Sequence, residues 1–398
     1  MKTGHHVGKI FVSFRNGITA QAVPQRVPAA KFSAEGSYLV TGGTKNFGFE
    51  VAKWIAAHGA GEVILVSRGG SDTAESKQAV EALKTQGVRV SVYACDVSDK
   101  RSVLQLMRQL TTDGDSTTPR HTIKPTKHLP LKGIFHAAVV LEDGFLRDLT
   151  AKSFNTVMSA KVLGALWLHQ LTAQFDIKLD MFVCLSSISA LIANPGQTSY
   201  VVANSFLDGL MRRRQSMGLA GTSVNFGAIG GTGILDRKAD VRGAFERFGV
   251  RAMPIPVACA GMGAVMASGE PQLGVYDVTM APWKSFIPWT ARSGRFAKLI
   301  EESLASAGSS QVSVSWRDII SALPVGDRVA RAQTDVLEAV SSVLRVAPEA
   351  LQLTRPVQDI GVDSLTALEI AGKLLTRCDV RVSTVEILRA LSITDCRC

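Results

Sequence analysis

The segment Tyr38-Leu-Val-Thr-Gly-Gly-Thr-Lys-Asn-Phe-Gly48 decides the fold of this chain. Its first four residues form a short apolar run that is typical of a buried strand, and the run stops at Gly42 and Gly43. A helical pattern follows from Phe49 to Ala57. A glycine turn between a strand and a helix lets backbone N–H groups approach a pyrophosphate at the helix N-terminus. The segment therefore predicts a dinucleotide-binding turn.

The alternation of strand and helix continues along the chain. Further buried strands are predicted at residues 63–66, 88–94, 133–136, 181–185, 222–226 and 272–278. Helices are predicted at residues 75–86, 103–110, 153–174, 199–217 and 239–269. Apolar strands that alternate with helices indicate a parallel sheet covered on both faces. We therefore expect a Rossmann-type, doubly wound α/β domain over residues 31–290, with a surface insertion at 111–130.

The remaining segments differ in composition from this domain. Residues 1–30 form a basic leader, and residues 291–330 are rich in Ser, Ala and Gly, which predicts a linker with a short helix near residues 316–323. Residues 331–398 show helical spacing at 334–344, 364–376 and 384–391. We expect a small all-α bundle there, apparently truncated because the chain stops at Cys398.

Composition excludes several classes of protein. Among 398 residues, 46% are hydrophobic and 20% charged, which excludes a disordered chain. No apolar run is long enough for a transmembrane helix, and the leader lacks the pattern of a signal peptide, so no membrane partner is expected. The net charge of +10 is spread out except at Arg212-Arg213-Arg214, without interleaved aromatic residues, so no nucleic-acid partner is expected either.

The six cysteines carry no zinc-binding spacing. No pair of them has histidines nearby, and Cys396 and Cys398 lie in the tail. We therefore expect free thiols in a reducing cytoplasm and no metal site.

Arg68 suggests which dinucleotide binds. It ends the second predicted strand, 20 residues after Gly48, where an acidic residue would bind a ribose hydroxyl and an arginine suits a 2′-phosphate. This favours NADPH over NADH, although Arg68 could also be an ordinary surface arginine. Asp96, after the third strand, is expected near the adenine. The expected cofactor-binding set is Thr41, Gly42, Gly43, Asn46, Phe47, Gly48, Ser67, Arg68, Asp96, Val97, Ala137 and Ala138.

Four polar residues form a candidate proton-transfer group. Tyr200 and Asn204 are four residues apart on one helix face, and Ser187 lies 13 residues before Tyr200, just past a strand. Lys161 lies on the preceding long helix. A tyrosine that protonates a carbonyl oxygen needs a lowered pKa, and a nearby ammonium lowers it. A serine hydroxyl can hold the same oxygen, and an asparagine can order a water relay.

At these residues the chain resembles the ketoreductases of multifunctional fatty-acid and polyketide synthases, within the short-chain dehydrogenase superfamily. The resemblance covers residues 36–290 and includes segments 38–43, 65–68, 136–143, 161–165, 185–187, 194–197 and 200–204. Common short-chain dehydrogenases carry the lysine four residues after the tyrosine. In the synthase ketoreductases an asparagine stands there and the lysine lies upstream, as with Asn204 and Lys161. The resemblance implies NADPH-dependent reduction of a β-ketoacyl group on a carrier thioester.

Three positions depart from the family pattern. Asn46 replaces the middle glycine of Thr-Gly-x-x-x-Gly-x-Gly, and we expect weaker cofactor binding there, because Asn tolerates positive φ but adds a side chain. Val139 stands where many polyketide ketoreductases have Gly. Leu141-Glu-Asp143 resembles the Leu-Asp-Asp loop of reductases that give D-configured alcohols, with Glu142 altered.

The segment Gly361-Val-Asp-Ser364-Leu365 resembles the attachment site of acyl carrier proteins. The resemblance implies that a phosphopantetheinyl transferase attaches 4′-phosphopantetheine to Ser364, at a helix N-terminus that favours the new phosphate. An ordinary capping serine is the alternative. The leader resembles the last strand of an enoylreductase, which suggests a fragment of a larger synthase or a split gene product with other synthase domains or subunits as partners.

Three functions remain open from the sequence. The first is a β-ketoacyl-thioester reductase joined to its carrier. The second is a free-standing short-chain dehydrogenase that acts on an unlinked ketone, and the third is a non-catalytic synthase fragment that acts as a binding scaffold. The carrier-like segment and the exchanged positions of Lys161 and Asn204 favour the first.

Overall fold

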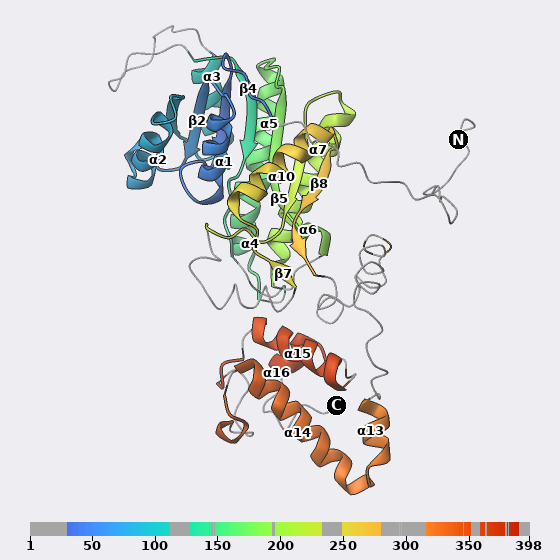
Figure 1. Cartoon of the computed structure of the whole chain (residues 1–398). Helices are drawn as coiled ribbons and strands as arrows, with labels where there is room; N and C mark the ends of the chain where they lie inside the picture. The colour runs from blue at the N-terminus through green and yellow to red at the C-terminus, as the bar shows by residue number, and fades with distance from the viewer. Residues whose placement is uncertain are drawn as a thin grey trace, which may run out of the picture.

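The computed structural model has a sheet region, coloured blue to yellow, and a helical region, coloured orange to red (Figure 1). The described residues are 30–111, 128–142, 144, 146, 148–192, 196–232, 249–279, 294, 296, 316–344, 346–351, 359–362, 364–378, 380 and 382–389. The predicted leader and most of the predicted insertion and linker lie outside them.

The sheet region is built on seven parallel strands in the order β3-β2-β1-β4-β5-β6-β8. The strands are β1 Ser37–Thr41, β2 Glu62–Ser67, β3 Arg89–Ala94, β4 Leu131–His136, β5 Met181–Ser187, β6 Thr222–Phe226 and β8 Gln272–Val275. The predicted doubly wound parallel sheet is thereby confirmed. The strand order reverses between β1 and β4, and ligands of such sheets bind at the carboxyl ends of the strands beside this reversal.

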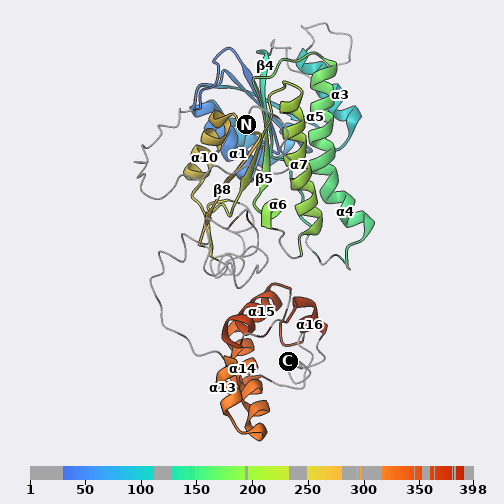
Figure 2. The ribbon, with the colours of Figure 1, turned by 90° about the vertical axis from the view of Figure 1, so that its right-hand side faces the viewer.

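Helices cover both faces of the sheet, because each presents an apolar stripe to it (Figure 2). The helices of one face are α1 Asn46–Ala57, α2 Ala74–Lys84 and α10 Ile255–Ser268. The helices of the other face are α3 Lys100–Thr111, α5 Gly164–Gln174 and α7 Thr198–Ser216. Two shorter helices, α4 Ala151–Met158 and α6 Ser189–Ile192, precede α5 and α7.

Three predicted elements differ in the structure. Of the helix predicted at 239–269, residues 239–248 lie outside the described residues, and Val250–Arg251 forms strand β7. The described helix α10 begins at Ile255, directly after Pro254, which has no N–H for a helical hydrogen bond. The strand predicted at 272–278 divides into β8 and a separate β9, Asp277–Val278, which pairs antiparallel with β7. The long helix predicted at 153–174 contains a π-helical turn at Ser159–Leu163 between α4 and α5.

The helical region has its own apolar core. Its elements are α13 Trp316–Ala322, α14 Val325–Leu344, a 3-10 turn at Pro348–Ala350, α15 Ser364–Cys378 and α16 Thr384–Arg389. Residues of α14, α15 and α16 pack together around Val340, Ile370 and Ile387. The Trp316 indole donates a hydrogen bond of 2.8 Å to Asp335, so the described helices of this region begin before the expected boundary at residue 331.

Candidate active site

The glycine turn after β1 has the backbone geometry that close approach to a ligand requires. Gly42 has φ +66°, in the left-handed region that favours glycine. A Cβ at Gly48 would lie 2.4 Å from the Gly42 carbonyl oxygen, so only glycine lets α1 start this close to the turn. Asn46 also has positive φ, at 52°, which agrees with the expectation that asparagine replaces glycine here at tolerable strain.

A cavity of about 360 Å³ lies at the carboxyl ends of β1, β2, β3 and β4. Six predicted cofactor residues line it: Gly42, Ser67, Arg68, Asp96, Val97 and Ala138. The Ser67 hydroxyl is buried without a hydrogen-bond partner, which fits a site where a bound ribose supplies one. A dinucleotide therefore fits the residues present.

The other predicted cofactor residues do not line this cavity. Phe47 packs edge-on against Phe226 with ring centroids 5.1 Å apart. The Thr41 hydroxyl is buried and bonded within the protein. Gly43, Asn46, Gly48 and Ala137 are likewise not among the residues that line it.

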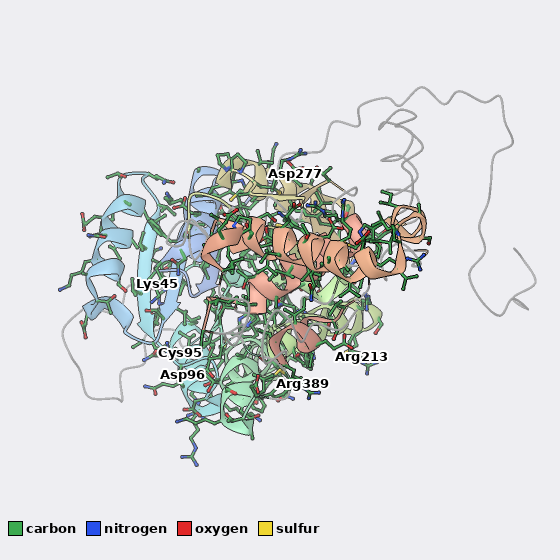
Figure 3. The ribbon with its side chains drawn as sticks, turned by 90° about the horizontal axis from the view of Figure 1, so that it is seen from below. Lys45, Cys95, Asp96, Arg213, Asp277 and Arg389 are labelled. Carbon is green, nitrogen blue, oxygen red and sulfur yellow. The ribbon has the colours of Figure 1, made fainter. Side chains whose placement is uncertain are left out.

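Several residues that line the cavity were missed from the sequence. Lys45 is exposed at the N-terminus of α1, and Cys95 and Asp96 lie across the cavity from it (Figure 3). The sequence could have indicated Lys45, because it lies inside the glycine-containing segment Tyr38–Gly48. Ser159 and Ala160, which also line the cavity, belong to the π-turn that contains Lys161.

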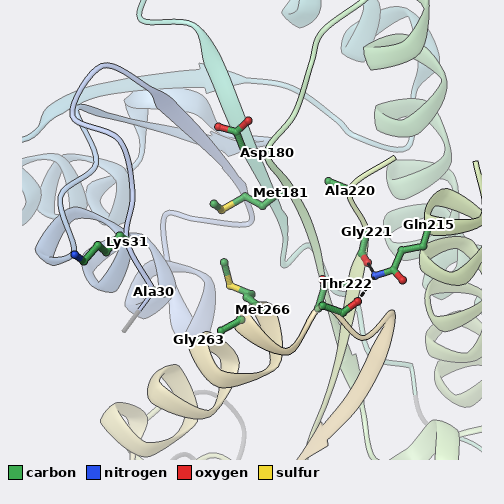
Figure 4. A pocket seen from close by; sticks show the side chains of 12 residues that line it. Ala30, Lys31, Asp180, Met181, Gln215, Ala220, Gly221, Thr222, Gly263 and Met266 are labelled. Atoms are coloured by element: carbon green, nitrogen blue, oxygen red, sulfur yellow. Dashed lines mark hydrogen bonds between the residues drawn. The ribbon is translucent and has the colours of Figure 1, made fainter. Parts of the chain in front are cut away.

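A second cavity, of about 380 Å³, lies at the opposite edge of the sheet (Figure 4). It is lined by Met181 and Thr222, at the amino ends of β5 and β6, and by Met266 of α10. The Gln215 amide closes one side by donating to the Gly221 carbonyl over 2.8 Å. None of the predicted site residues reaches this cavity, so it is not part of the candidate site.

Lys161 and Tyr200 come together as the sequence predicts. Lys161 is buried, and its Nζ donates a hydrogen bond of 2.7 Å to the Leu185 carbonyl oxygen. The same Nζ lies 5.5 Å from the centroid of the Tyr200 ring. An ammonium at this distance from a phenol favours the phenolate, which is the condition for a tyrosine to act as an acid near neutral pH.

Asn204 and Ser187 border this pair. The Asn204 Nδ2 donates to the Tyr200 backbone carbonyl over 2.8 Å, and its buried Oδ1 has no hydrogen-bond partner. A buried acceptor without a partner is a position where a water could donate a hydrogen bond. Ser187 ends β5, is half-buried, and its Oγ accepts a hydrogen bond of 3.2 Å from the Ser189 backbone N–H.

Burial lowers the pKa of Lys161 to about 8, and the negative charge of Asp208 opposes that shift. A lysine with such a pKa loses its proton close to physiological pH, whereas an exposed lysine keeps it. Its protonation can therefore influence a proton transfer at Tyr200.

A buried polar network lies behind these residues and was not found from the sequence. Asp208, on α7, accepts hydrogen bonds from Ser223, Asn225 and Gln272 at 2.6–3.2 Å. The Asn225 Nδ2 also donates to the Ser187 carbonyl oxygen over 3.1 Å. The network thereby ties the backbone of Ser187 to α7. In the sequence, a buried aspartate of a helix cannot be distinguished from a solvent-exposed one.

The predicted attachment serine, Ser364, is the first residue of α15. Gly361 has φ +91° and turns the chain just before the helix. Asp363 lies outside the described residues. The N-terminus of a helix stabilises an anion through unpaired backbone N–H groups and the helix dipole.

Two family models match the chain in the order in which the two regions occur. Residues 36–231 match the KR domain, and residues 334–395 match the phosphopantetheine attachment site. The sheet region therefore belongs to the KR domain family and the helical region to the phosphopantetheine attachment family.

The related proteins are polyketide synthases. The chain is 30% identical over 376 residues to one subunit of the phenolphthiocerol/phthiocerol polyketide synthase of Mycobacterium tuberculosis, covering 94% of this chain and 16% of that protein. It is 28% identical over 409 residues to highly-reducing polyketide synthase 1 of Aureobasidium melanogenum, covering 99% of this chain and 18% of that protein. The chain thus spans less than a fifth of the length of these two relatives.

Solved structures of ketoreductases share the fold of the sheet region. The structure of A-type ketoreductases from a modular polyketide synthase matches with 32% identity and a TM-score of 0.57, covering 66% of this chain and 52% of that one. A ketoreductase from the first module of phoslactomycin biosynthesis in a Streptomyces species matches with 28% identity and a TM-score of 0.60. The match covers 69% of this chain and 59% of that one. These likenesses confirm the expected ketoreductase fold.

Proposed function

We propose that this chain reduces the β-keto group of an acyl thioester to a β-hydroxy group with NADPH, within a polyketide or fatty-acid synthase. The observation that carries the proposal is the position of the buried Lys161 ammonium over the Tyr200 ring, beside a dinucleotide cavity. The KR domain match and the polyketide synthase relatives support the same reaction class.

The roles of the four polar residues follow from their surroundings. Tyr200 donates the proton to the carbonyl oxygen as that oxygen gains negative charge. Lys161 makes this donation easier by stabilising the phenolate, and the Ser187 hydroxyl binds the same carbonyl oxygen. Asn204, through its unpaired Oδ1, orders a water that returns a proton toward Lys161.

The cofactor cavity supports NADPH in particular. Arg68 and Lys45 both line it, and two cations suit the additional 2′-phosphate. Ser67 supplies the unpaired hydroxyl for a ribose. When bound, the nicotinamide supplies the hydride that reduces the carbonyl carbon.

The helical region would carry the acyl chain on phosphopantetheine at Ser364. The support is the family match over residues 334–395 and the position of Ser364 at the start of α15. The partners of this function are a phosphopantetheinyl transferase, the acyl carrier thioester and the other synthase domains or subunits.

We also propose a cytoplasmic location. Among the described residues, Cys95, Cys184, Cys259 and Cys378 are free thiols, as a reducing compartment allows. In the part of the chain that the structure describes, no helix is long and apolar enough to cross a membrane.

The direct test is reduction of a β-ketoacyl N-acetylcysteamine thioester, followed by NADPH absorbance. We expect turnover with this substrate, and faster turnover than with an unlinked ketone of the same carbon skeleton. Equal turnover of both would favour a free-standing dehydrogenase. NADPH binding without any turnover would favour the non-catalytic fragment.

A further inference from the structure

His136 is a buried histidine to which the proposed reaction gives no role. It is the last residue of β4, is fully buried, and lies between Thr41 of β1 and Cys184 of β5 in the sheet register. Its Nδ1 lies 2.9 Å from the Thr41 hydroxyl oxygen, and its Nε2 lies 3.0 Å from the Lys161 backbone carbonyl oxygen. The imidazole therefore joins the strand that leads into the cofactor turn to the residue that carries the catalytic ammonium.

These partners fix the protonation state of the ring. A carbonyl oxygen can only accept, so Nε2 carries the hydrogen and donates it to Lys161. Burial, and then the positive charge of Lys161, lower the pKa of His136 to about 3, so the ring is neutral. Nδ1 is then an acceptor for the Thr41 hydroxyl. The Thr41 oxygen itself accepts the backbone N–H groups of Ala137 and Ala138, each at 3.2 Å, which leaves its hydrogen for the ring.

The carbonyl that His136 holds belongs to the π-turn at Ser159–Leu163. A π-turn adds one residue to a helical turn and is rare outside functional sites. The Lys161 carbonyl also receives the Gly164 backbone N–H. Gly164 is needed for the imidazole to come this close, because a Cβ there would lie 2.8 Å from the His136 Cε1.

We propose that His136 is a positioning residue for Lys161. Its Nε2–H holds the Lys161 carbonyl and so fixes the direction in which the lysine leaves the π-turn, with Nζ on the Leu185 carbonyl and over the Tyr200 ring. Thr41 orients the imidazole from the other side. The role of this contact in turnover rests on the proposed function, whereas its effect on the position of Lys161 does not.

A matched pair of amides separates the two hydrogen bonds of the ring. In His136→Gln, the side-chain amide nitrogen can reach the position of Nε2 and donate to Lys161. In His136→Asn, the shorter amide reaches only the position of Nδ1, so the contact to Lys161 is lost. We expect kcat of His136→Asn to fall by about 10²-fold, the cost of a displaced catalytic group, with KM and NADPH affinity unchanged. His136→Gln should stay close to the wild type.

A double variant shows whether the effect passes through Lys161. In a Lys161→Ala background, His136→Asn should lower kcat no further, because the group that it positions is gone. Two results would overturn the proposal. One is equal kcat values for His136→Asn and His136→Gln when Lys161 is present. The other is that His136→Asn lowers kcat as much in the Lys161→Ala variant as in the wild type.

A second measurement reads the position of Lys161 without turnover. We expect a lysine-acylating reagent to label Lys161 faster in His136→Asn than in the wild type or His136→Gln, as read by peptide mass spectrometry. Equal labelling in all three proteins refutes the positioning role even if the chain reduces no thioester. An inactive wild type with the expected labelling refutes the proposed function alone.

A glycine pair tests the same contact if His136→Asn does not fold. Gly164→Ala pushes a methyl group against the His136 ring, so labelling of Lys161 should rise and kcat should fall. Gly209→Ala is the control, because a Cβ on that helical glycine meets no atom within 4 Å. The same response in both variants would contradict the role of His136.

Discussion

The sheet region and the helical region place their functional groups differently. In the sheet region, Lys161, His136 and Asn204 are at most 2% exposed and belong to the same packed interior as the apolar core. In the helical region, the buried polar groups, such as Asp335, hold helices together, and the predicted attachment residue Ser364 only begins a helix. The proposed chemistry of the sheet region thus depends on many fixed neighbours, whereas the proposed chemistry of the helical region depends on one residue.

The same contrast appears in how each region neutralises a buried aspartate. Asp208 is held by hydroxyl and amide groups of β6 and β8, whereas Asp335 is held by the Trp316 indole and by Arg331 and Arg377, whose side chains are about half exposed. Water can replace an arginine at the surface, whereas Ser223 and Asn225, two of the donors to Asp208, are fully buried. We therefore expect the loss of Asp208 to destabilise the sheet region more than the loss of Asp335 destabilises the helical region.

The largest expected effect is the loss of phosphopantetheine attachment when the Ser364 hydroxyl is removed. Ser364→Ala should abolish addition of phosphopantetheine by a promiscuous transferase, because the hydroxyl is the proposed attachment point. Intact-mass spectrometry should show one adduct on the wild type and on the control Ser342→Ala, and none on Ser364→Ala. Thioester reduction should be unchanged in all three proteins. An adduct on Ser364→Ala would place the carrier function elsewhere.

In the sheet region, removal of one hydroxyl should be nearly as damaging to function. Tyr200→Phe should lower turnover of the thioester by about 10²–10⁴-fold, the usual cost of losing a general acid, with NADPH binding retained. Tyr276→Phe is the matched control, because this half-buried tyrosine lies in a different apolar cluster. Near wild-type turnover in Tyr200→Phe would show that another group supplies the proton.

The two buried aspartates test the contrast in stability. Asp208→Ala leaves the buried Ser223 hydroxyl without its acceptor, at a cost of about 1–3 kcal/mol. It also removes one acceptor each from Asn225 and Gln272, which keep other acceptors in the network. Asp335→Ala should cost less, because Arg331 and Arg377 can turn to water. Denaturant unfolding, monitored separately for each region, measures both. A larger loss for Asp335→Ala would contradict the comparison.

The pH dependence of turnover tests the coupling of Lys161 to Tyr200. With the pKa of Lys161 lowered to about 8 by burial, the pair loses a proton near that pH, and turnover of the wild type should fall as pH rises through it. In Lys161→Ala, turnover should be lower, and its alkaline decline should move to higher pH, because the cation that lowers the tyrosine pKa is gone. If the alkaline decline of turnover stays at the same pH in Lys161→Ala, then Lys161 does not lower the pKa of Tyr200.

The smallest expected effect concerns the exposed rim of the cofactor cavity. Arg68→Ala should narrow the preference for NADPH over NADH by about tenfold, the cost of a charge-assisted hydrogen bond at ~1.5–3 kcal/mol. Arg101→Ala, an exposed arginine on α3, is the control and should leave the ratio unchanged. Ratios of kcat/KM for the two cofactors decide the matter, and an unchanged ratio in Arg68→Ala removes this role.

The fold could be predicted from the sequence because apolar strands and helices alternate with clear glycine boundaries. The start of α10 was missed although the signal was present, since Pro254 and Pro256 stand inside the segment predicted as one helix. The spacing of Ser187, Tyr200 and Asn204, together with the resemblance, predicted one group with Lys161, and the structure brings Lys161 and Tyr200 together.

The supporting contacts could not be predicted. His136 lies 25 residues from Lys161, and Asp208 lies 64 residues from Gln272, so only the folded chain brings them together. The π-turn has no signal in the sequence either, because residues 153–174 show one continuous helical pattern. The contact of the Thr41 hydroxyl with the His136 ring, at 2.9 Å, was also not predicted.

The π-turn makes the continuous helical segment from α4 to α5 sensitive to the insertion or deletion of a single residue. Each residue of an α-helix advances the chain by about 100° around the axis, so one extra residue rotates everything that follows by that angle. Here α4 packs on α7 and α5 packs on α3, two different neighbours reached by one continuous helical segment. A single-residue deletion within Ser159–Leu163 would preserve composition and helix propensity, yet it would turn α5 away from α3. The helix should therefore tolerate substitutions in this segment far better than changes in its length.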